Sequence, residues 1–185
     1  MPSIVERMLT PALAACLLLA APANLSFADP AIPSVAILDV RIINDNEGLD
    51  PLSDAEHARG VKLEDQFKTA LEKSGKFTIV PMTPEVKAAI VKGQFIGECG
   101  GCEVEFGKKL GAERIAWVTV QKISNLILNL NVYMADVATN RMTFLKSVDI
   151  RGNTDESWSR SMTYLLNNYM LVDTPSTSDA APKTQ

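Results

Sequence analysis

This 185-residue chain contains a single histidine, His57, and only three cysteines. Serine hydrolases of the usual type need a histidine base, and four-ligand zinc sites commonly combine histidines with cysteines. His57 lies among charged residues at a predicted helix start, where a surface position is expected. The composition therefore argues against a hydrolase and against a metal site, and we expect no cofactor.

Basic clusters and phosphate-binding glycine loops are also missing. The chain has 18 Lys and Arg against 22 Asp and Glu, which gives a formal net charge of -4. Because nucleic acids are bound by basic patches, no nucleic acid is expected as a partner. The glycines between positions 93 and 101 lack the spacing of dinucleotide-binding or P-loop motifs. With no catalytic set of residues in the sequence, we predict a protein that is not an enzyme.

Residues 1–28 have the pattern of an export signal. Arg7 precedes an apolar segment, and Ser26-Phe27-Ala28 places small residues at the two positions that signal peptidase reads. Cleavage after Ala28 predicts a periplasmic protein with no transmembrane helix in its mature chain. The alternative is a lipoprotein with Cys16 as its lipidated N-terminus, but the apolar run continues beyond Cys16, where lipoproteins normally turn polar.

Cleavage after Ala28 leaves Cys99 and Cys102 as the remaining cysteines in an oxidising compartment. An even number of cysteines there favours a disulfide bond. A redox-active pair is the alternative, because a helix N-terminus can stabilise a thiolate. Neighbouring glutamates oppose thiolate formation by charge repulsion, which favours a structural bridge. These glutamates are Glu98, Glu103 and Glu105.

The first half of the domain reads as a βαβ unit. Residues 34–43 are rich in Val, Ile and Leu with little alternation, as in a strand covered on both faces. Ser53 and Glu56 form a capping-box pattern at the start of a helix. A short strand at residues 76–82 follows, and Pro81 favours an edge position for it. Two further helices are then predicted, before residue 111.

Residues 114–158 read as three successive strands that run into a final helix. In the middle strand, one set of alternate residues is apolar, whereas the other set contains Asn129, Asn131 and Tyr133. Asparagine is disfavoured in strands, so two at alternate positions need a reason. We predict that they line a groove or meet a partner; the alternative is that the last helix covers them through hydrogen bonds.

The third strand adds Asp149 and Arg151 to this candidate binding face. A purely structural role is the alternative, because Arg151 is expected to pair with Asp149 or with acids in the first turn of the final helix. Asn153, with Glu156 three residues later, is predicted to cap that helix.

Together these elements predict an α/β fold for residues 29–172. The expected architecture is a five-stranded mixed sheet, with a βαβ unit, further α-helices, an antiparallel three-stranded meander and a C-terminal helix. Residues 173–185 are rich in Pro, Ser and Thr and are expected to form a disordered tail.

The strings KISNLILN (residues 122–129) and VDIRGNTDESW (residues 148–158), together with CGGC, carry a resemblance over residues 35–171. They resemble a family of small exported bacterial proteins of unknown function, mostly alphaproteobacterial. The order of elements also resembles the N-terminal domain of TolB and CsgG-type envelope modules, although propeller repeats and long hairpin insertions are missing. The resemblance implies a non-enzymatic accessory or protein-interaction module whose partner is another envelope protein. The alternatives are a periplasmic thiol-disulfide oxidoreductase that uses the CGGC pair, or a small-ligand-binding protein.

Overall fold

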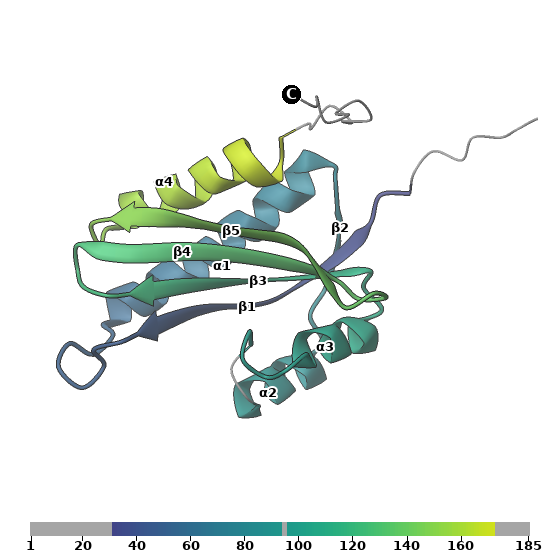
Figure 1. Cartoon of the computed structure of the whole chain (residues 1–185), viewed down its shortest axis with the longest axis horizontal. Helices are drawn as coiled ribbons and strands as arrows, with labels where there is room; N and C mark the ends of the chain where they lie inside the picture. Colours follow the sequence, from purple (N-terminus) through teal and green to yellow (C-terminus); the bar gives the residue numbers. More distant parts are fainter. Residues whose placement is uncertain (1–30, 94–95, 173–185) are drawn as a thin grey trace, which may run out of the picture. The chain divides into compact units, whose positions relative to one another are not determined.

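A single mixed sheet organises the fold. The computed structural model describes residues 31–93 and 96–172. The strands are β1 (Ser34–Asn44), β2 (Thr78–Val80), β3 (Arg114–Lys122), β4 (Ile127–Asp136) and β5 (Arg141–Arg151). Their order is β2-β1-β3-β4-β5, with β2, β1 and β3 parallel and with β3, β4 and β5 as an antiparallel meander (Figure 1). The predicted fold class is confirmed, and β2 lies at an edge as Pro81 indicated.

The helices begin where the local sequence provides caps. They are α1 (Asp54–Ser74), α2 (Pro84–Lys92), α3 (Cys102–Leu110), α4 (Asp155–Leu165) and a π-helical turn, η1 (Leu166–Met170). Ser53 caps α1 in a reciprocal arrangement with Glu56, as predicted. The start of α4 differs from the prediction, because its cap is Thr154 with Ser157 rather than Asn153 with Glu156. None of the helices in the described residues is both long and apolar enough to cross a bilayer.

The first face of the sheet is covered by α1 and α4 (Figure 1). Phe67 of α1 and Met162 of α4 are fully buried against alternate residues of the strands. Burying a large apolar side chain stabilises a fold by about 1.5–3 kcal/mol, so this cluster is the main source of stability. Its strand residues include Val35, Ile37, Ala116, Val118, Val120, Leu128, Leu130, Val132 and Ile150.

The second face of the sheet carries α2 and α3 at one end only. A smaller apolar cluster lies beneath them, formed by Leu38, Val86, Ile90, Ile96, Val104, Ile115, Trp117, Ala135 and Val137. Because α4 packs on the first face, it does not cover the asparagines of β4. The alternative prediction, that the last helix covers Asn129 and Asn131 through hydrogen bonds, is therefore wrong. The predicted export signal, Cys16 and the predicted tail lie outside the described residues.

Candidate functional site

Side chains on the second face form rows that run across the strands. Residues paired in the register lie side by side on one face, because side chains alternate along each strand. The row nearest α3 is Trp117, Tyr133 and Leu145. The next two rows are Arg41, Thr119, Asn131 and Ser147, and then Ile43, Gln121, Asn129 and Asp149. We call these last two rows the open sheet face, since neither apolar cluster of the described residues extends over them on this side.

Hydrogen bonds between neighbouring strands hold the asparagines of the open sheet face. Asn131 Nδ2 donates to Thr119 Oγ1 at 3.2 Å. The Asn129 side-chain amide is oriented so that its nitrogen donates to Asp149 Oδ1, also at 3.2 Å. Both asparagines are half-buried, whereas Ser147 and Asp149 at the outer strand are exposed. The two asparagines are therefore tolerated in β4 because their amides are hydrogen-bonded to side chains of the neighbouring strands. The face presents an ordered polar surface.

Tyr133 belongs to the packing beside α3 rather than to the open sheet face. Its ring stacks on Trp117, with the ring centroids 5.1 Å apart and the planes 7° from parallel. Trp117 is 5% exposed, and its Nε1 has no hydrogen-bond partner in the described residues. The five predicted face residues are thus divided between a packed row and an open surface.

Arg151 does not make the ion pairs expected of it. Asp155, at the start of α4, instead forms ion pairs with Arg59 at 2.8 Å and with Lys62 at 2.6 Å, both from α1. Within the described residues Arg151 has no ion pair and is exposed. The reason is geometrical, because Arg151 projects from the second face whereas α4 packs on the first. Arg151 therefore remains available at the end of the open sheet face.

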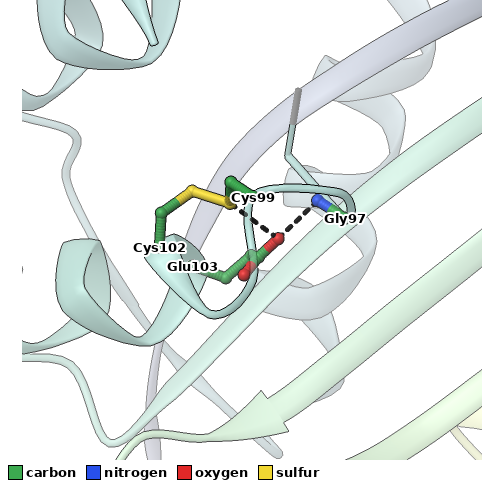
Figure 2. Close-up of a disulfide and its surroundings, with 4 residues drawn as sticks. All are labelled: Gly97, Cys99, Cys102 and Glu103. Carbon is green, nitrogen blue, oxygen red and sulfur yellow. Dashed lines mark hydrogen bonds between the residues drawn. A yellow bond between two sulfur atoms is a disulfide. The ribbon is translucent and has the colours of Figure 1, made fainter. Parts of the chain in front are cut away.

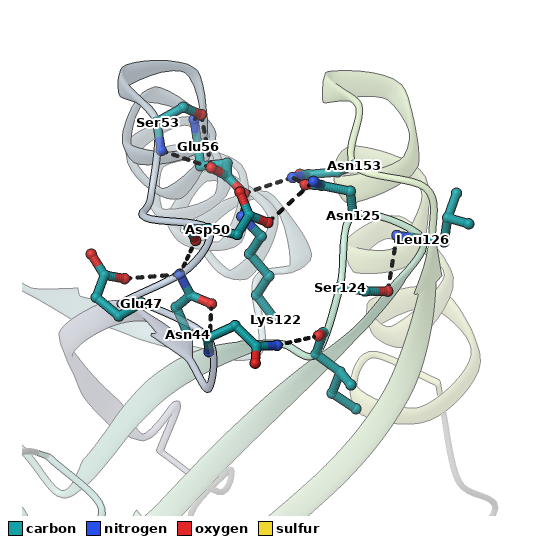
Figure 3. A network of polar contacts seen from close by, with 12 residues as sticks. Asn44, Glu47, Asp50, Ser53, Glu56, Lys122, Ser124, Asn125, Leu126 and Asn153 are labelled. Atoms are coloured by element: carbon teal, nitrogen blue, oxygen red, sulfur yellow. Dashed lines mark hydrogen bonds and ion pairs between the residues drawn. The ribbon is translucent and has the colours of Figure 1, made fainter.

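A buried ionic network joins the end of β3 to the start of α1 (Figure 3). Lys122 Nζ lies 2.9 Å from Glu56 Oε1 and 3.0 Å from Asp50 Oδ2. The side chains of Lys122 and Glu56 are only 2% and 4% exposed. Sequence analysis missed this pair; the available signal was a lysine that continues the apolar alternation of Val118 and Val120.

Hydrogen bonding, rather than burial, sets the charge states in this network. Burial by itself would raise the pKa of Glu56, but hydrogen bonds from the Ser53 backbone, Lys122 and Asn153 lower it to about 2. Burial would lower the pKa of Lys122, and its bonds to Glu56 and Asp50 outweigh this and raise that pKa. Both groups are therefore charged at neutral pH and satisfied by each other, which indicates a structural role.

Asn153 does not cap α4 because its side chain is hydrogen-bonded to other residues. Its Nδ2 donates to Glu56 Oε1 at 2.6 Å and to Asn125 Oδ1 at 3.0 Å. Its Oδ1 accepts from Arg59 and from the buried indole of Trp158, each at 3.0 Å. The Asn153 side chain thus bonds to groups of α1, α4 and the β3–β4 turn, and the next residue, Thr154, caps α4 instead.

The predicted cysteine pair lies in the loop that leads into α3 (Figure 2). The sulfur atoms of Cys99 and Cys102 are 1.91 Å apart, within disulfide-bonding distance. Glu103 is buried, and its Oε1 accepts from the Gly97 N–H and lies 3.2 Å from Cys99 Sγ. The ligand atoms of Cys99, Cys102 and Glu103 lie within 4.8 Å of one another, but sulfurs joined in a disulfide are not metal ligands.

The model of the family DUF3280, whose description reads "Protein of unknown function (DUF2380)", matches residues 33–170. The chain belongs to this family. The match covers both the CGGC pair and the VDIRGNTDESW string, and it confirms the expected assignment to a family of unknown function. A comparison with curated proteins finds no match.

Several solved structures are similar to this DUF3280 member. The C-terminal domain of LpoB from Salmonella enterica is 17% identical, with 65% of this chain and 84% of that chain covered and a TM-score of 0.45. Lipoprotein GNA1162 from Neisseria meningitidis is 9% identical, with 75% and 99% covered and a TM-score of 0.49. TolB from Acinetobacter baumannii is 16% identical, with 75% and 29% covered and a TM-score of 0.42.

Proposed function

We propose that this protein is a non-enzymatic accessory module of the bacterial envelope that binds another envelope protein through the open sheet face. The observation that carries the proposal is that two neighbouring rows of the second face, mostly polar and hydrogen-bonded between strands, carry no helix within the described residues. A periplasmic location is supported by the export pattern of residues 1–28 and by the paired cysteines.

The chemistry of the face favours a protein partner over a small molecule. Small-ligand sites are concave and bury most of the ligand. A cavity of about 380 Å³ lies at the β1 edge of the open sheet face, beside Arg41 and Ile43. Toward β5 the residues Ser147 and Asp149 are exposed, so most of the face offers an extended surface instead. Its amides and hydroxyls supply both donors and acceptors, and lateral bonds such as that from Asn131 to Thr119 reduce the ordering needed on binding.

Site-specific photo-crosslinking in the native bacterium tests the proposal. A photoreactive amino acid is placed at Ser147 on the open sheet face and, as a matched control, at Thr69, an exposed residue of α1. We expect one defined crosslinked protein from position 147 and none of that size from position 69. Substituting Asn131→Ala in the first variant is expected to reduce its yield.

The proposal is wrong if position 147 captures nothing, or if positions 147 and 69 capture the same species in equal yield. Circular dichroism of each variant establishes that the fold is retained before the yields are compared.

A further inference from the structure

The cysteine pair opens into a cavity instead of being enclosed by the core. The cavity, about 490 Å³, lies between the CGGC loop and the β4–β5 turn. Cys99 and Cys102 are half-buried, and the two residues between them are glycines with open space where a Cβ would be. A small thiol can therefore approach the sulfur atoms without displacing side chains.

A stabilising role alone accounts poorly for this bridge. Cross-linking stabilises a fold chiefly by closing loops in the unfolded chain, and the effect grows with the number of residues enclosed. Cys99 and Cys102 are only three residues apart, so the loop is close to the shortest that a disulfide can close. Accessible bridges are also the ones that exchange with thiols most readily.

Glu103 provides the second, independent observation. Its side chain is buried, its Oε1 lies 3.2 Å from Cys99 Sγ, and it has no ion pair within the described residues. A disulfide sulfur has no proton to donate, so this contact gains a hydrogen bond only when Cys99 is a thiol. In the reduced form the Cys99 S–H would donate to a charged acceptor that is already held in place by the Gly97 N–H.

We propose that Cys99 and Cys102 form a reversible thiol-disulfide exchange site, in which Glu103 holds the proton on Cys99 in the reduced form. The reductant is a dithiol. This inference goes beyond the proposed function and does not depend on it. It concerns the cysteine loop that leads into α3 and uses no residue of the open sheet face.

The exchange balances in two steps. A thiolate of the dithiol attacks Cys99 Sγ, and Cys102, the first residue of α3, leaves as a thiolate that is then protonated from water. The second thiolate of the reagent then closes the reagent's own disulfide and releases Cys99. The two protons lost by the dithiol reach Cys99 and Cys102 through water, and two electrons pass from reagent to protein. Cys99 keeps its proton because Glu103 would repel a thiolate.

The test is an equilibrium titration of the folded protein with dithiothreitol, read by alkylation and mass spectrometry. All variants carry Cys16→Ser, so that only the CGGC pair is counted. We expect reversible reduction and reoxidation without unfolding. Glu103→Gln removes the charge of the acceptor and is expected to shift the equilibrium about fivefold toward the disulfide. Glu72→Gln, at an exposed residue of α1 on the first face of the sheet, is the matched control and is expected to change nothing.

The proposed exchange site is refuted if the wild-type bridge is reduced only as the chain unfolds. The role of Glu103 is refuted if Glu103→Gln and Glu72→Gln shift the equilibrium equally. Should Glu103→Gln fail to fold by circular dichroism, Glu103→Asp replaces it. The shorter carboxylate keeps the charge but loses the contact, and it is expected to shift the equilibrium in the same direction.

Discussion

Replacing Lys122 by methionine tests how far the buried network supports the fold. The substitution keeps most of the length of the side chain but leaves Glu56 charged, buried and without its cation. Removing one partner of a buried ion pair typically costs about 3–5 kcal/mol, because the remaining charge is no longer compensated. For a domain of this size, we expect the melting temperature to fall by about 10 °C or more.

Urea unfolding at pH 7 measures the cost of Lys122→Met directly from the midpoint, provided that the slope is unchanged. The double variant Lys122→Met/Glu56→Gln removes the uncompensated charge and should recover about 2 kcal/mol of the loss. Lys62→Met is the surface control. Its Nζ pairs with Asp155 at 2.6 Å, but the Lys62 side chain is 66% exposed, so a change within about 0.5 kcal/mol is expected. A Lys122→Met cost below about 1 kcal/mol, or a double variant no more stable than the single one, would refute this account.

Two further predictions concern acid stability and core packing. Because the pKa of Glu56 falls from 4.5 in an ordinary environment to about 2 in the fold, its contribution of about 3 kcal/mol is complete above pH 4.5 and is lost as the pH falls toward 2. Urea unfolding at pH 7, 4 and 2.5 should show this loss, and the pH dependence should be clearly smaller in Glu56→Gln. Gly107→Ala would place a Cβ 2.6 Å from methyl groups of Ile115 and Val137, so thermal melting should report a loss of about 1–3 kcal/mol. Gly48→Ala, which meets nothing within 4 Å, should leave stability nearly unchanged; equal melting of the two variants would contradict the packing argument.

Local patterns in the sequence were sufficient for most of the fold. The capping box at Ser53, the position of Pro81 and the alternation along β4 each depend on residues a few positions apart. Hydrogen bonding and side-chain direction at that range follow from backbone geometry alone. The same alternation placed Asn129 and Asn131 together on one face, so part of the candidate site was also predictable.

Interactions between distant residues were decided only in the tertiary structure. Lys122 contacts Glu56 because the end of β3 and the start of α1 lie next to each other in the fold. No local sequence pattern pairs residues so far apart in the chain. Asn153 has a cap-like sequence, yet its amide is taken by Glu56 and by Trp158.

The extent of the open sheet face was likewise beyond the sequence. Alternation showed that β4 has one polar face, but not which helices would lie on it. The packing of α4 beside α1 on the first face, with α2 and α3 at one end of the second, decided that Tyr133 is packed and Asn131 remains on the open face. The sequence by itself determined the elements and their inward and outward sides, because these follow from short-range periodicity. Which surfaces stay uncovered depended on how the apolar sides of distant elements packed together.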